Sequence, residues 1–132
     1  MFNTASAVAY GGARARYRTV DVSSRLEGAS PHRLVAILFE ELVRAIETAQ
    51  AADRRGDRGK RAERQARALS ILHALEASLD FERGGEIATS LSAVYREGRR
   101  LIGEGYRENR PELVEQARAM LAEIAEAWDG IG

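Results

Sequence analysis

The chain has 132 residues, with 20 basic and 20 acidic side chains that cancel, two histidines and no cysteine. A chain of this length forms one domain with a modest core. The balanced charge produces no overall field that would favour nucleic acid or an anionic membrane. The lack of cysteine excludes disulfides, thiolate metal sites and a cysteine nucleophile.

Neither a membrane span nor a secretory signal is expected. No apolar run approaches the roughly 18 residues that a transmembrane helix needs. The opening MFNTASAVAYGG lacks the basic and continuous apolar regions of a signal peptide. We therefore expect a cytoplasmic protein without membrane insertion.

Residues 1–29 show no sustained hydrophobic period and are rich in small residues. We expect this N-terminal cap segment to be partly ordered, either flexible, as chain ends often are, or docked on the rest of the protein. In the docked form Tyr10 is the expected anchor, because an aromatic ring in a tail of small residues tends to be buried.

The first long helix is predicted to begin at Pro31 and to end near Asp53. Ser30 is a good N-cap, and proline fits the first helical position. Ile37 and Val43 fall outside the main apolar face, so this helix must be covered from more than one side or keep surface for a partner. The main face repeats at three-four spacing and comprises Leu34, Val35, Leu38, Leu42, Ala45, Ile46 and Ala49.

A second helix is predicted from about Lys60 to Phe81. Ile71 lies on a different side from its main apolar stripe. Gly84 and Gly85 follow, and one of them is expected to adopt the left-handed conformation that closes a helix. The stripe comprises Ala62, Ala66, Leu69, Leu72, Leu75 and Leu79.

The third helix is predicted to start near Glu86 with one narrow apolar stripe. Gly98 lies on this stripe, as expected where a neighbouring helix approaches closely. Gly103 and Gly105 are expected to mark fraying towards the turn at residues 107–110. The stripe comprises Ile87, Ala88, Leu91, Val94, Tyr95, Leu101 and Ile102.

Pro111 opens the last helix, whose apolar stripe ends at Trp128. Four amphipathic helices with short connections predict an all-α, antiparallel up-down four-helix bundle over residues 30–132, preceded by the N-terminal cap segment. No segment of any length alternates with the period of a β-strand.

No motif indicates catalysis, a metal site or a cofactor. A di-iron bundle needs Glu-x-x-His pairs, but Ala29 precedes His32 and Ser70 precedes His73 at this spacing. We expect the His32 side chain to be solvated. The basic run Arg54–Arg67 is diluted by acidic residues and lacks interleaved aromatics, so a solvated helix face is favoured over nucleic-acid binding.

The apolar residues outside the main faces favour an interaction protein. Ile37, Val43 and Ile71 would suit a groove that takes an amphipathic partner helix. Cover by residues 1–29 is the other explanation, and the two can alternate.

Three blocks of the chain resemble the FliS family of flagellar secretion chaperones. The first runs from Ala29 to Val35 and on through Leu38-Phe39-Glu40. The second runs from Leu79 to Ala88 and is followed by Leu91 and by Val94-Tyr95. The third is Ala127-Trp128, and the pair Ala9-Tyr10 upstream matches the N-terminal tyrosine of the family.

This resemblance implies a non-enzymatic helical bundle that binds the disordered C-terminal segment of flagellin in the cytoplasm, one to one, and prevents premature polymerisation. Flagellar export-gate components are further candidate partners. The expected client groove comprises Ile37, Val43 and Ile71, with Leu91 and Tyr95 as weaker candidates because their stripe already explains them as core. Tyr10 is the expected anchor of the N-terminal cap. A general helical adaptor and a nucleic-acid binder acting through Arg54–Arg67 stay open as alternatives.

Overall fold

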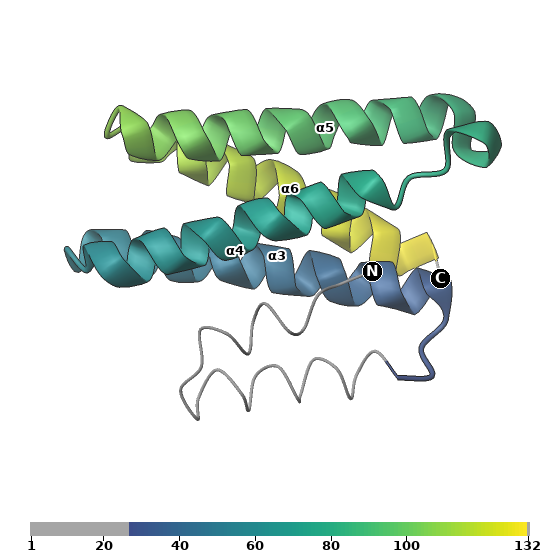
Figure 1. The fold of residues 1–132 in the computed structure, drawn as a ribbon, viewed down its shortest axis with the longest axis horizontal. Helices are drawn as coiled ribbons and strands as arrows, with labels where there is room; N and C mark the ends of the chain where they lie inside the picture. Colours follow the sequence, from purple (N-terminus) through teal and green to yellow (C-terminus); the bar gives the residue numbers. More distant parts are fainter. Residues whose placement is uncertain (1–26, 132) are drawn as a thin grey trace.

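The computed structural model describes residues 27–131, so Tyr10 and the rest of residues 1–26 lie outside the described part. Four helices follow one another: α3 (Pro31–Arg54), α4 (Arg58–Ala77), α5 (Phe81–Arg107) and α6 (Pro111–Ile131). Figure 1 shows that consecutive helices run in opposite directions and are joined by short turns. The expected all-α bundle is confirmed.

Side-chain caps fix where the first two helices begin. Ser30 Oγ accepts a hydrogen bond of 3.1 Å from the amide of Arg33, and Pro31 takes the first helical position. Asp57 Oδ1 accepts one of 3.0 Å from the amide of Lys60. Both oxygens satisfy amides that have no partner within the helix, as the sequence predicts for Ser30.

The boundary between the second and third helices differs from the prediction. α4 ends at Ala77 rather than near Phe81, because Asp80 starts a new helix: its Oδ1 accepts hydrogen bonds of 3.1 Å from two first-turn amides. Gly85 has the expected positive φ, 49° with ψ −121°, but it lies inside α5 and kinks it. The regular part of α5 therefore begins near the predicted Glu86.

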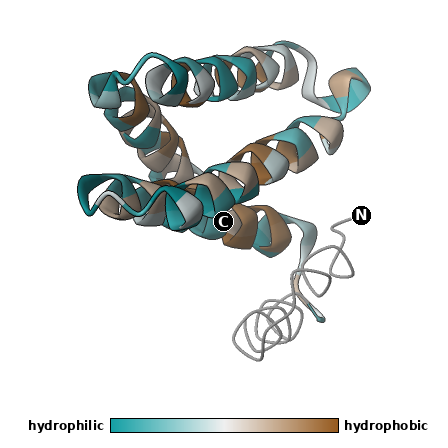
Figure 2. Ribbon diagram, turned by 60° about the vertical axis from the view of Figure 1, so that its left-hand side comes forward, coloured by the Kyte–Doolittle hydropathy of each residue, from teal (hydrophilic) through white to brown (hydrophobic). Residues whose placement is uncertain are grey.

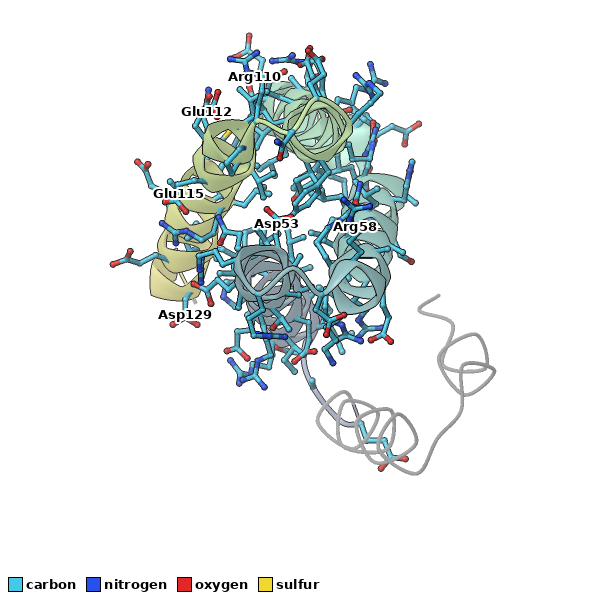
Figure 3. All side chains as sticks on the ribbon, turned by 90° about the vertical axis from the view of Figure 1, so that its left-hand side faces the viewer. Asp53, Arg58, Arg110, Glu112, Glu115 and Asp129 are labelled. Carbon is cyan, nitrogen blue, oxygen red and sulfur yellow. The ribbon has the colours of Figure 1, made fainter. Side chains whose placement is uncertain are left out.

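The four helices form a closed ring around one core. α3 contacts α4 and α6, and α5 contacts the same two helices from the other side. The view along the bundle in Figure 3 shows this arrangement, with α3 and α5 at opposite corners. Each helix thus has two neighbours, which explains why apolar residues spread over wide helix faces.

The core consists of one cluster of buried apolar side chains, and Figure 2 shows apolar and hydrophilic residues alternating along every helix. Gly98 lies where the helices come closest, since a Cβ there would stand 3.2 Å from Leu121 Cδ1. Gly105 does not mark fraying: a Cβ there would stand 2.7 Å from Val114 Cγ2. The cluster includes Phe39, Leu42, Ile46, Ile71, Leu72, Leu75, Tyr95, Leu101, Ile102, Val114 and Leu121.

Candidate binding surface

The structure divides the five predicted groove residues into two groups. Ile37, Ile71 and Tyr95 are buried, with exposed fractions of 1%, 0% and 2%. Val43 and Leu91 are half-buried. A partner could therefore touch the second group in this conformation, but not the first.

Ile71, predicted to lie on a different side of its helix from the main apolar stripe, is buried in the core. α4 packs against both α3 and α5, so two of its faces are covered. Ile71 belongs to the central cluster together with Leu72. A residue about 100° away from the main stripe is still core when a helix has two neighbours.

Apolar surface instead gathers on the first turns of α5, where the sequence placed core. The ring of Phe81 is 53% exposed and the side chain of Ile87 is 71% exposed. Ile87 was predicted to belong to the buried stripe, but within residues 81–90 Ala88 alone is buried and Gly84 half-buried. Leu91 follows one turn after Ile87 on the same face and is half-buried.

The kink at Gly85 shapes this surface. Its backbone conformation, with φ 49°, is one that a side chain would disfavour. After the kink, Thr89 Oγ1 donates to the Gly85 carbonyl at 3.2 Å. A shallow hollow of about 520 Å³ lies here, lined by Phe81, Gly85, Glu86, Thr89 and Ser90.

A single carboxylate ties α4 to the part of α5 that follows these exposed residues. Glu76 accepts hydrogen bonds from Arg99 Nη2 at 2.7 Å, from Ser92 Oγ at 2.9 Å and from Arg96 Nε at 3.0 Å. Because these donors favour the charged form, the Arg99 bond above all, the pKa of Glu76 falls to about 2. The ionised carboxylate holds α5 against α4 along residues 92–99.

Aromatic stacking closes the end of α6 onto the start of α3. The rings of Trp128 and His32 are stacked with centroids 4.7 Å apart and planes 12° apart. Trp128 Nε1 donates to the His32 carbonyl at 3.0 Å, and Phe39 lies 6.4 Å away, centroid to centroid. The expectation of a solvated His32 was wrong, because its ring is covered by Trp128 and its Nε2 is buried.

Polar bridges join the helices at the opposite end, which faces the viewer in Figure 3. Arg61 places its guanidinium 4.7 Å from the ring centre of Tyr106, and burial together with the charge of Asp53 raises the pKa of that phenol to about 12. Gln50 Nε2 donates to Glu115 Oε1 at 3.0 Å and links α3 to α6. These contacts keep this end compact.

Within residues 27–131, no three His, Cys, Asp or Glu side chains are placed to hold a metal ion. The basic run is distributed over the α3–α4 turn and the first turns of α4, where Arg64 pairs with Glu63 at 2.6 Å. None of the described helices is long and apolar enough to cross a membrane.

An all-α bundle with exposed apolar side chains on the first turns of α5 has the features of a helical interaction protein. The family model for flagellar protein FliS matches residues 13–132. The chain therefore belongs to the FliS family, which is a family of chaperones and not of enzymes.

Curated relatives agree with this assignment over most of their length. The flagellar secretion chaperone FliS of Salmonella typhimurium is 36% identical over 116 residues, 87% of this chain and 86% of that protein. FliS of Vibrio cholerae is 32% identical over 115 residues, 87% of this chain and 85% of that protein. FliSB of Pseudomonas aeruginosa is 29% identical over 116 residues, 88% and 92% of the two chains.

Proposed function

We propose that this chain is a cytoplasmic export chaperone that binds the disordered C-terminal segment of flagellin one to one. Occupying that segment would prevent premature polymerisation and keep the subunit competent for export. Family membership supports the role in flagellar export, and the surface of α5 supports a client that presents apolar side chains.

The observation that carries the proposal is the exposure of apolar side chains on the first turns of α5, where Phe81 and Ile87 are exposed and Leu91 is half-buried. Two of these side chains are more than half exposed although the rest of α5 packs closely in the bundle. Burying an exposed isoleucine contributes about 1.5–3 kcal/mol. A client helix that covers this surface would gain that free energy without any rearrangement of the bundle.

The predicted groove residues enter the proposal in two ways. Val43 and Leu91 are half-buried and can contact a client directly. Ile37, Ile71 and Tyr95 would contact it only if the elements covering them move. We propose the first two as contact residues and expect the other three to act chiefly through stability.

The N-terminal cap is a second part of the proposal. Tyr10 would dock where the client binds, so the two would compete for one surface. Replacement of Tyr10 by serine should then raise client affinity by the free energy of undocking the cap. Equal affinity of both proteins would refute the cap while leaving the chaperone intact.

Two matched substitutions on exposed isoleucines test the proposal. A labelled peptide of the C-terminal segment of flagellin from the same organism is titrated with the wild-type chain, Ile87→Ser and Ile131→Ser, and fluorescence anisotropy reports binding. Ile131 is 74% exposed at the end of α6 and serves as the control. We expect Ile87→Ser to lose about tenfold or more in affinity and Ile131→Ser to bind as wild type.

An equal loss of affinity in both variants would show that the client does not bind specifically to the exposed residues of α5. If the flagellin segment does not bind at all while unrelated amphipathic helices do, the protein is a general helical adaptor instead.

A further inference from the structure

The second half of α6 is attached to the bundle by few contacts. The last buried side chain of this helix is Leu121. Among the described residues, the hydrogen bond from Trp128 to the His32 carbonyl is the one side-chain hydrogen bond or ion pair that residues 119–131 make. The apolar side chains beyond Leu121 that pack against the core are half-buried, and they are Ile124, Ala125 and Trp128.

Charge destabilises the same half of α6. Its carboxylates follow one another at intervals of three residues, a spacing at which like charges on a helix repel each other. A helix carries partial negative charge at its carboxyl end, and α6 has no basic residue in its last turn to offset that charge. No ion pair among the described residues neutralises the carboxylates either. They belong to Glu123, Glu126 and Asp129.

Trp128 holds these last turns in place. Its ring stacks on that of His32 with centroids 4.7 Å apart, so the end of α6 meets the start of α3 (Figure 1). The contact carries a penalty, because His32 Nε2 is buried without a hydrogen-bond partner among the described residues. One stacked ring and one hydrogen bond thus oppose charge repulsion and a buried polar atom. We therefore expect the closed arrangement to be favoured by a small margin.

Opening of these turns would uncover Phe39, which is 1% exposed in the closed bundle. The centroid of its ring lies 6.4 Å from that of Trp128 and 6.3 Å from that of Tyr95. Tyr95 follows Ile87 and Leu91 at intervals of four residues, on the same face of α5. Without Trp128 in place, Phe39 would therefore extend the exposed apolar face of α5 towards α3.

We infer that residues 122–131 form a latch that opens separately from the rest of the bundle when Trp128 leaves His32, and that the open form binds the client more tightly. The second part rests on the proposed function, because it takes the C-terminal segment of flagellin as the client. The open form offers Phe39 to that segment in addition to the exposed residues of α5. Client binding and opening of the latch therefore favour each other.

Amide hydrogen exchange measured by NMR on the full-length protein tests the latch without any client. Residues 124–129 should share one free energy of opening, smaller than that of residues 113–121, because the latch opens as a unit. Trp128→Phe keeps a ring beside His32 but loses the hydrogen bond, and should speed exchange of the latch by about two- to tenfold. Glu126→Gln/Asp129→Asn removes repulsion and should slow that exchange by about two- to tenfold.

Gln50→Ala is the control, because it removes a hydrogen bond between α3 and α6 at the opposite end of the bundle. It should leave exchange of the latch unchanged. Ordinary fraying of a helix end gives a different pattern. If protection falls steadily towards residue 131 and Trp128→Phe leaves it unchanged, the latch does not open as a unit and the inference is wrong.

Client binding is then measured with the labelled C-terminal segment of flagellin and the same proteins. Trp128→Phe should bind more tightly than wild type, by at most the factor by which exchange of its latch rises, and Glu126→Gln/Asp129→Asn should bind more weakly. Equal affinities despite altered exchange would overturn the inference and leave the proposed function standing. If the wild-type protein does not bind the segment, the proposed function fails together with the client part of this inference, and the exchange data alone decide whether the latch opens.

Discussion

Two glycines of α5, two residues apart, should respond in opposite directions to the same substitution. At Gly105 an added Cβ would stand 2.7 Å from Val114 Cγ2 and 3.0 Å from the carbonyl oxygen of Arg110. At Gly103 an added Cβ would meet nothing within 4 Å. Glycine to alanine is therefore a matched pair in which only the space around the new methyl group differs.

The magnitudes follow from two opposing terms. Alanine stabilises a helix interior over glycine by up to about 1 kcal/mol, a gain available at both positions. Overpacking costs about 1–3 kcal/mol, and at Gly105 the backbone oxygen of Arg110 cannot move away as a flexible side chain could. We expect Gly103→Ala to raise the free energy of unfolding by up to about 1 kcal/mol. The free energy of unfolding of Gly105→Ala should lie about 1–3 kcal/mol below that of Gly103→Ala.

Urea denaturation followed by circular dichroism measures both variants against wild type. Adding Val114→Ala to Gly105→Ala should recover part of the loss, because it removes the nearer of the two obstructing atoms. Equal stabilisation by Gly103→Ala and Gly105→Ala would show that α5 and α6 do not approach as closely as the structure requires.

Three further substitutions test other contacts of the bundle. The lowered pKa of Glu76 means that its charged form stabilises the fold at pH values above 4.5, the ordinary pKa of the group. The difference in unfolding free energy between wild type and Glu76→Gln should therefore shrink as the pH falls from 4.5 towards 2. A constant difference would contradict the stabilising role of the Glu76 carboxylate. Trp128→Phe keeps an aromatic ring but loses the hydrogen bond to the His32 carbonyl, and thermal denaturation should show a loss of about 1 kcal/mol; an unchanged stability would contradict that bond. Ile71→Ala should lower the free energy of unfolding by about 2–5 kcal/mol, and a variant of unchanged stability with weakened client binding would instead place this residue in the groove.

The sequence allowed the fold to be predicted because its helix signals are local. Ser30 with Pro31, and Pro111 further on, marked two helix starts, and apolar spacing identified all four helices. The Asp80 cap was missed because its carboxylate stands next to Phe81, which continues the apolar pattern of the preceding helix. Apolar spacing cannot show that a helix restarts within such a run.

The binding surface was harder to predict, because exposure depends on which helices lie next to one another. Ile71 departs from the stripe of its helix but has a second neighbour, and is buried. Ile87 fits the stripe of α5 but lies two residues after the kink at Gly85, and is exposed. The Gly84-Gly85 pair was the available signal, because Gly85 kinks α5 directly before Glu86 and Ile87.

Isothermal titration calorimetry of the full-length chain with the C-terminal segment of flagellin from the same organism, at two or more temperatures, tests the central claim most directly. The account predicts saturation at one segment per chain and a negative change in heat capacity, because apolar side chains of α5 and of the client leave water together. Absence of binding, or saturation at a ratio other than one, would contradict it.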